Sequence, residues 1–336
     1  MTPPPSKRAR TSSTSGDTNR MEFEELTKLK RRENMWFEDG NIVLATDVHL
    51  YCVHRGVLAR NSTFFKEMLE LPNVGNTSNS EVGSIENGDS WEGKPLVRMV
   101  GDRDEDVYHI LMALYDVRFY SAHKPTTLPV FLSLIRMGTK YNFSHILDEI
   151  SLHIKLAYPT DLDSMVERTY EELFVCYDNN NDFQLLLVAE QCDMKILLPM
   201  LYFDCADSSL STILEESKDL DLPNSILLKI LRGYEKISRY ATQRGIRSFS
   251  PHRKCTLSCQ TARMELFANY TENPPYFSVH DLLQRNPIKV DKNLRLSVCE
   301  NCEKASFDAS EDLRLEIWNA IPSMFELGSW EDYRSE

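Results

Sequence analysis

Three residues near the start of the chain, His49, Cys52 and His54, carry side chains that can do chemistry. A cysteine becomes a nucleophile when a base lies within hydrogen-bond reach and an electropositive setting favours the thiolate. If this segment is a strand, Cys52 and His54 share one face, because side chains alternate between the faces. A cysteine on an apolar strand is more often a small buried hydrophobe. We therefore expect structural roles for all three.

Sequence motifs of the common enzyme classes do not occur. Nothing matches a Gly-rich phosphate loop, a dinucleotide fingerprint, HExxH or GxSxG. Acidic runs such as "GDRDED" (101–106) are expected to be solvated faces rather than catalytic carboxylates. The sequence thus predicts a protein that is not an enzyme and has no catalytic residues.

Four cysteines near the C-terminus form a second candidate site. Cys255 and Cys259 belong to "CTLSC", and Cys299 and Cys302 to "CENC". On helices these spacings place both thiols of a pair on one face. Two such faces brought together could hold zinc with four sulfur ligands and no open position, which is a structural site. His252 could replace one thiol, and the alternative is four thiols packed separately in helix interfaces.

The first 20 residues differ in composition from the rest. They are rich in Pro, Ser and Thr and poor in large apolar groups, so they cannot bury enough surface to offset the entropy of ordering. We expect a disordered tail over residues 1–20. Its "SKRAR" segment resembles a nuclear import signal that would use Lys7, Arg8 and Arg10, with a solvated basic tail as the alternative.

Composition and charge narrow the compartment and the partners. The N-terminal segment lacks the apolar stretch of a secretory signal, which predicts an intracellular protein of the cytoplasm, the nucleus or both. No run approaches the roughly 20 apolar residues that a membrane helix needs, so no membrane partner is expected. The formal net charge of −13 disfavours nucleic acid as a partner.

Apolar periodicity predicts a mixed first half and a helical second half. A leading helix over 22–34 has a thin apolar stripe of Phe23 and Leu26. It should be followed by two strands joined by a tight turn, two short helices, a long Gly- and Ser-rich surface loop, a third strand and further helices. The expected bounds are 41–46 and 50–53 for the first strands, 73–95 for the loop, 96–100 for the third strand and 144–157 for the last of these helices.

Two features of the later segments are also predicted. Asp102 and Glu105 would form an acidic capping box where the helix after the third strand begins. From Thr160 onward the spacing is helical almost throughout, and an apolar cluster between Trp318 and Trp330 is expected either to dock on the helical domain or to bind a partner.

The order strand, strand, helix, helix, strand, helix, short strand, helix, helix resembles the BTB/POZ domain. "DGNIVLATD" is similar to the opening strand of that family, and "YCVHRGVLARNSTFFKEML" to its passage from strand to helix. The stretch "WFEDGNIVL…VHRGVLARNS" is especially similar to the BTB proteins that are numerous in fungi. The framework residues that the resemblance implies are Asp39, His54, Arg55, Val57, Leu58, Phe64 and Phe65.

The resemblance implies an α+β BTB/POZ domain over residues 21–158, with a small sheet flanked by helices, and then a mostly α-helical domain over 159–336. It also implies a protein-interaction module that forms homodimers, with Phe23 and Leu26 as dimer contacts, and that serves as an adaptor for a cullin-type ubiquitin ligase. The alternative is a nuclear transcriptional regulator that recruits co-repressors through the BTB domain. The long loop and the thin leading helix depart from the family pattern.

Overall fold

The structure is a computed structural model that describes residues 26–71, 90–167, 174–175, 180–249, 255–272, 282–283 and 298–334. The chain divides into two compact units. The N-terminal unit comprises Met1–Phe119 and Lys140–His145, and the C-terminal unit comprises Tyr120–Thr139 and Ile146–Glu336.

This division differs from a domain boundary at 158. Helices α5 (Leu128–Tyr141) and α6 (Ser144–Ala157) each contribute residues to both units. Phe131 of α5 and His153 of α6 place their rings 5.3 Å and 5.2 Å from the ring of Phe174. Apolar contacts of this kind assign most of the two helices to the C-terminal unit.

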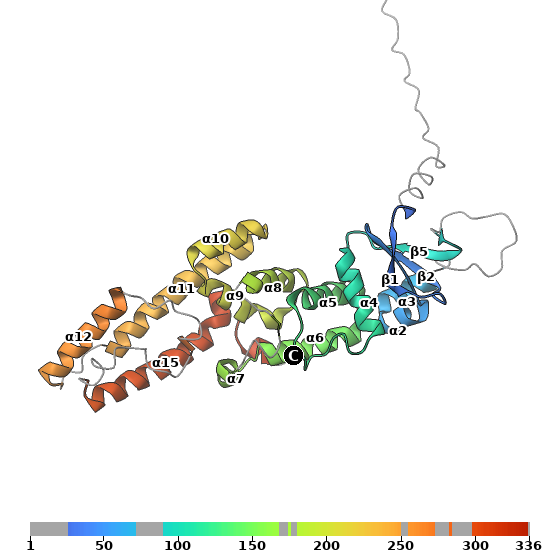
Figure 1. Ribbon diagram of the computed structural model, residues 1–336. Coiled ribbons are helices and arrows are strands. Elements are labelled where there is room, and N and C mark those ends of the chain that lie inside the picture. The colour runs from blue at the N-terminus through green and yellow to red at the C-terminus, as the bar shows by residue number, and fades with distance from the viewer. Residues whose placement is uncertain are drawn as a thin grey trace, which may run out of the picture. The chain divides into compact units, whose positions relative to one another are not determined.

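A small mixed sheet forms the centre of the N-terminal unit (Figure 1). Its strand order is β1-β3-β2-β5-β4, with β2 antiparallel to β3 and parallel to β5. The bounds are β1 Lys30–Trp36, β2 Ile42–Ala45, β3 His49–Val53, β4 Ser90–Trp91 and β5 Lys94–Arg98. Every residue of β2 is buried, as expected for a central strand covered on both faces.

The turn between β2 and β3 lies where the sequence predicts it. The hydroxyl oxygen of Thr46 accepts hydrogen bonds from the backbone N–H groups of Val48 and His49, at 3.2 Å and 3.0 Å. A threonine side chain that bonds to the backbone two and three residues later stabilises a tight turn. Two short helices, α2 (Arg55–Asn61) and α3 (Thr63–Glu70), follow β3.

The prediction of a leading helix over 22–34 is wrong from Thr27 onward, because residues 27–29 form a turn and Lys30–Trp36 forms strand β1; residues 22–25 lie outside the described part of the chain. This strand runs parallel to β3, and its backbone hydrogen bonds at the sheet edge outweigh the helix propensity of the charged residues. The guanidinium of Arg31 lies 4.4 Å from the Trp36 ring, and that of Arg32 lies 4.2 Å from the Tyr108 ring. Because adjacent side chains of a strand point to opposite faces, each of the two arginines covers an aromatic ring on a different face of β1.

The expected capping box is also wrong. Helix α4 (Asp104–Tyr115) follows Arg103, whose side chain makes no capping hydrogen bond. Asp102 instead accepts hydrogen bonds from Lys140, at 2.7 Å, and from the hydroxyl of Tyr141. These tertiary contacts draw the carboxylate away from the helix end.

Only part of the expected loop over 73–95 lies within the described residues. Residues 90–95 form an antiparallel hairpin instead, with β4, a turn at residues 92–93 and the first two residues of β5. Residues 73–89 lie outside the described ranges.

The described residues of the C-terminal unit are mostly helical, as the sequence predicts. After α6 come α7 (Leu162–Glu167), α8 (Asn180–Gln191), the 3-10 helix η2 (Lys195–Leu197), α9 (Leu198–Asp207) and α10 (Leu210–Asp219). The last elements are α11 (Asn224–Phe249), α12 (Leu257–Glu272), α15 (Glu300–Met324) and α16 (Glu331–Arg334). None of the helices in the described part of the chain is long and apolar enough to cross a membrane.

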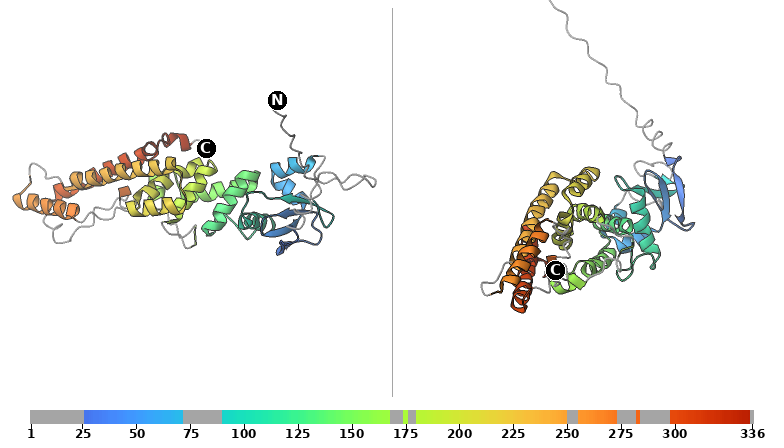
Figure 2. Two further views of the ribbon diagram at one scale, coloured as in Figure 1. Left: turned by 90° about the horizontal axis from the view of Figure 1, so that it is seen from above. Right: turned by 60° about the vertical axis from the view of Figure 1, so that its left-hand side comes forward.

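Helix α11 is the longest helix in the described part of the chain and packs against α9, α12 and α15. It runs beside α15 in every view (Figure 2). Two glycines permit close approach along it: Gly233 faces the ring of Phe325, and Gly245 faces the ring of Tyr270. The Trp318–Trp330 cluster docks on the unit, because the ring of Phe325 lies against Gly233 of α11 and stacks on Tyr202 of α9 at 5.3 Å. Within the cluster the two indoles stack at 4.4 Å, and Trp330 donates a hydrogen bond to the carbonyl oxygen of Trp318.

Candidate metal centre

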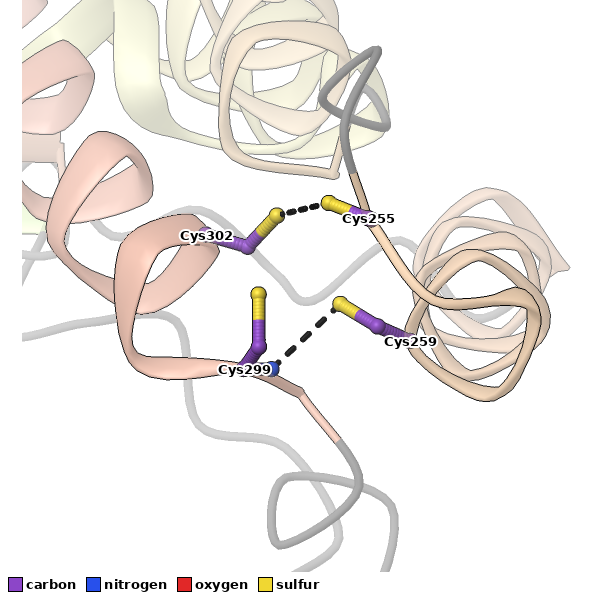
Figure 3. A group of neighbouring side chains, drawn as sticks. All are labelled: Cys255, Cys259, Cys299 and Cys302. Carbon is purple, nitrogen blue, oxygen red and sulfur yellow. Dashed lines mark hydrogen bonds between the residues drawn. The ribbon is translucent and has the colours of Figure 1, made fainter.

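The four predicted cysteines come together in the C-terminal unit (Figure 3). Their sulfur atoms all lie within 4.8 Å of one another. Cys259 lies in the first turn of α12, and Cys255 lies two residues before that helix begins. Cys299 is the N-cap of α15, and Cys302 lies in its first turn. The two pairs, which are about 40 residues apart in the sequence, face each other.

The distances between the sulfur atoms suit a compact tetrahedral site. A zinc–sulfur bond of about 2.3 Å gives a tetrahedron with sulfur–sulfur edges of about 3.8 Å. The sulfur atoms of Cys255 and Cys302 are 2.7 Å apart, which is below that edge, and all four lie within 4.8 Å of one another. The 2.7 Å separation also exceeds the length of a disulfide bond, which is about 2.05 Å, and all four residues are free thiols.

Local hydrogen bonds hold the first pair. The hydroxyl of Thr256 accepts from the backbone N–H of Cys259 at 3.3 Å, which caps the start of α12. The side-chain amide of Gln260 donates to the carbonyl oxygen of Cys255 at 3.2 Å. The residues between and beside the cysteines thus fix the backbone that carries both thiols.

The second pair uses the helix start itself. Cys299 is the N-cap of α15, and its carbonyl oxygen accepts from the N–H groups of Cys302 and Glu303 at 2.9 Å and 3.0 Å. The backbone N–H of Cys299 donates to the sulfur of Cys259 at 3.3 Å, which joins the two pairs directly. The N-terminal end of a helix carries partial positive charge, so both pairs lie where a thiolate is favoured.

The pKa values of three of the thiols are shifted in different directions. The backbone N–H of Cys302 and the thiol of Cys259 lower the pKa of Cys299 to about 7. Hydrogen bonding to Cys302 is the largest of the causes that raise the pKa of Cys255 to about 12, and burial raises the pKa of Cys259. One thiolate is therefore accessible near neutral pH, and a bound cation would displace the remaining protons.

Within the described residues the cluster offers four sulfur donors and no oxygen or nitrogen ligand, a set that suits a soft or borderline cation such as zinc. A cation bound by all four thiolates would have no open position for a substrate. The alternative of four thiols packed separately does not hold, because the structure brings them into one cluster. His252 lies outside the described residues, and the cluster forms from the four cysteines alone.

His49, Cys52 and His54 are not brought together as a catalytic group. Cys52 is fully buried, and its sulfur accepts a hydrogen bond from the Lys94 ammonium at 3.2 Å. His49 points to the opposite face of β3, where its Nδ1 lies 2.7 Å from Asp104. In the described part of the chain, no hydrogen bond joins the thiol to either imidazole.

Most of the framework residues have structural contacts. His54 places Nδ1 at 3.1 Å from the hydroxyl of Tyr115 and Nε2 at 3.2 Å from a carboxylate oxygen of Asp39. Arg55 donates from its guanidinium to the carbonyl oxygen of Leu69 at 3.2 Å. These bonds hold the β3–α2 junction and the end of α3.

The apolar framework residues divide by helix face. Leu58 and Phe65 are buried, and Val57 is partly buried. Phe64 is 45 % exposed, and its ring lies 5.7 Å from that of Phe65 and 5.1 Å from that of Tyr141. In α3 the positions of Phe65 and Leu69 face the core, and Phe64 is turned about 100° from Phe65.

The expected dimer contacts and import signal are mostly outside the described residues. Phe23, Lys7, Arg8 and Arg10 lie in the undescribed first 25 residues. Leu26 is 5 % exposed and packs with residues of β2, β3 and β5. Its apolar surface is thus already covered inside the N-terminal unit.

Two groups of interacting residues have no clear signal in the sequence. Asp104, in the acidic run expected to be solvated, has a side chain that is only 9 % exposed. It accepts hydrogen bonds from Thr46, His49 and Tyr51, at 2.5 Å, 2.7 Å and 2.8 Å. Residue type alone does not show which charges of this acidic run are buried and which are exposed.

The second group is that of Arg263, a buried cation that contacts the backbone of Cys302 at 3.0 Å.

Comparison with known proteins does not assign a family. No family model matches the chain, and no curated protein matches it.

Proposed function

We propose that this protein is a non-enzymatic adaptor that binds other proteins, with a BTB-type N-terminal unit and a helical C-terminal unit stabilised by zinc. The observation that carries the proposal is the setting of His49, Cys52 and His54. Each is held by a structural partner, so the residues best suited to nucleophilic chemistry serve the framework of the sheet.

The order of elements supports the BTB assignment. After β1, the N-terminal unit runs β2, β3, α2, α3, β5, α4, with the hairpin strand β4 added before β5, and the chain continues into α5 and α6. This order differs from the one that the resemblance implies in two ways: β1 and β4 are added, and the short strand expected after α4 is absent, because residues 117–119 form a turn. The expected partners are a second copy of the chain and a cullin-type scaffold of a ubiquitin ligase.

Light scattering on the full chain tests self-association. A homodimer has twice the chain mass of 38.9 kDa. A strictly monomeric mass at tens of micromolar would remove the dimer from the proposal. A pull-down with a purified cullin scaffold tests the adaptor role in the same preparation, and no binding would exclude it.

The alternative function, a nuclear regulator that recruits co-repressors, makes a different prediction. Fluorescent fusions with and without residues 1–20 would then differ in nuclear signal. An unchanged cytoplasmic signal in both fusions counts against it.

We further propose that Cys255, Cys259, Cys299 and Cys302 bind one structural zinc ion, which joins the starts of α12 and α15. Support comes from the compact sulfur cluster and from the helix ends that favour thiolates. Zinc would supply a fixed tetrahedral link between two helix starts that lie about 40 residues apart.

Elemental analysis of protein purified without added metal should give one zinc ion per chain. Cys302→Ser removes a ligand and should lower both the zinc content and the thermal midpoint. Cys205→Ser is the matched control, because Cys205 is equally buried but lies outside the cluster. Burying a hydroxyl in its place costs about 1–3 kcal/mol and should leave the zinc content unchanged. Absence of stoichiometric zinc, with equal midpoints for the two variants, would refute the site.

A further inference from the structure

A buried guanidinium group lies beside the four cysteines. Arg263 belongs to α12, one turn after Cys259, and only 3 % of its surface is exposed. Its Nη1 donates to the carbonyl oxygen of Cys302 at 3.0 Å. Its Nη2 and Nε donate to the carbonyl oxygens of Ser248 at 2.7 Å and Phe249 at 3.2 Å. One side chain of α12 thus joins the end of α11 to the first turn of α15.

The contacts with α11 have an evident structural role. The last carbonyl groups of a helix lack donors within the helix, and α11 ends at Phe249. Arg263 supplies donors to the carbonyls of Ser248 and Phe249, where positive charge also complements the helix dipole. Capping α11 does not explain the third hydrogen bond, which holds the main chain of a cysteine in the cluster.

The charge of the cysteine cluster with a bound metal ion explains the hydrogen bond from Arg263 to the carbonyl oxygen of Cys302. Four thiolates around one divalent cation leave two net negative charges in a partly buried place. Two helix starts offset part of this charge, and a buried guanidinium within hydrogen-bond reach of Cys302 offsets more. A buried arginine is stabilised in turn by nearby negative charge.

We propose that Arg263 is a positioning residue of the zinc site: it fixes the backbone of Cys302, complements the charge of the loaded centre, and couples metal binding to the end of α11. The inference rests on the zinc site proposed above. Partners of metal ligands that orient them by hydrogen bonds typically contribute about 10- to 100-fold to metal affinity.

The test measures zinc affinity of the full-length protein by competition with a chromogenic chelator. Arg263→Met should lower the affinity about 10- to 100-fold, and Arg263→Lys, which keeps the charge, should lower it less. Cobalt substituted for zinc in the Arg263→Met protein should give an altered visible spectrum, because the position of one ligand changes.

Tyr270→Phe is the matched control. Tyr270 also belongs to α12 and is buried, and its hydroxyl donates to the carbonyl oxygen of Ala241 in α11 at 2.6 Å. Its removal loosens the same seam between helices without touching a cysteine. We expect a lower thermal midpoint and an unchanged zinc affinity.

The outcomes separate the two proposals. Wild-type protein that binds no zinc refutes the metal site. Wild-type protein that binds zinc, with unchanged affinity in the Arg263→Met variant or an equal loss in the Tyr270→Phe variant, overturns the role of Arg263 alone. If Arg263→Met does not fold, Arg263→Lys decides, and an affinity equal to wild type overturns the inference.

Discussion

Gly233→Ala should destabilise the C-terminal unit, although alanine is the better helix former. A β-carbon at Gly233 would lie 2.0 Å from Cε1 and 2.7 Å from Cζ of Phe325. The Phe325 ring is fully buried and stacks on Tyr202, with a centroid separation of 5.3 Å. The ring has no free space on either side, so the helices must separate to admit the methyl group.

The magnitude follows from two opposing effects. Replacing glycine by alanine inside a helix stabilises by about 1 kcal/mol. Forcing an extra methyl group into a packed interior costs about 1–3 kcal/mol, and the 2.0 Å approach to ring carbon places this site at the upper end or beyond. We expect a net loss of about 2 kcal/mol or more.

Urea unfolding of the full chain measures the effect, with fluorescence of Trp318 and Trp330 reporting on the C-terminal unit. Gly56→Ala is the control, because Gly56 also lies in a helix and a β-carbon there meets nothing within 4 Å. That variant should be neutral or slightly stabilised. In a Phe325→Leu background, Gly233→Ala should lose most of its cost, because the ring is gone. A Gly233→Ala protein as stable as wild type would refute the packing argument.

Two further predictions concern buried hydrogen bonds. Burial raises the pKa of Asp104, but its three side-chain hydrogen bonds outweigh that and hold the pKa below its ordinary value. Because the pKa is lower in the folded state, its stabilisation is complete above about pH 4 and is lost as the pH falls through the folded-state pKa. Asp104→Asn should therefore be less stable than wild type in urea at pH 7, and the difference should shrink below pH 4; a pH-independent difference would contradict this. Trp330→Phe removes the donor to the buried carbonyl of Trp318 and should cost about 1–3 kcal/mol by thermal unfolding, whereas equal midpoints would contradict docking of the C-terminal cluster.

Short strands of the N-terminal unit were predictable because their residues are buried on both faces. Ile42–Ala45 and His49–Val53 are unbroken runs of apolar or strand-forming residues, and their limits agree with the predicted ones to within a residue or two. Lys30–Trp36 was not predictable in the same way. Its charged residues favour a helix, and only the free edge of β3, which belongs to the tertiary structure, makes it a strand.

Buried charge was the feature that residue type could not reveal. Asp102 and Asp104 lie in one acidic run, yet their side chains are only 5 % and 9 % exposed. Their partners come from sequence positions about 40 to 60 residues away, such as Lys140 and Thr46. From sequence alone a carboxylate is expected to be solvated, because the distant donors that surround it in the fold are not known.

The cysteine cluster was predictable in one respect and unpredictable in another. The spacing in "CTLSC" and "CENC" predicted that the thiols of each pair act together, although only Cys259 and Cys302 lie within helices, and it did not predict that the two pairs meet. Helix α11 holds α12 and α15 next to each other, because it packs against both of them. It can do so closely because Gly245 admits the ring of Tyr270 from α12 and Gly233 admits the ring of Phe325 at the end of α15, where β-carbons would lie 2.2 Å and 2.0 Å from ring atoms. Two glycines twelve residues apart on one helix therefore help to determine whether four distant thiols can reach one metal ion.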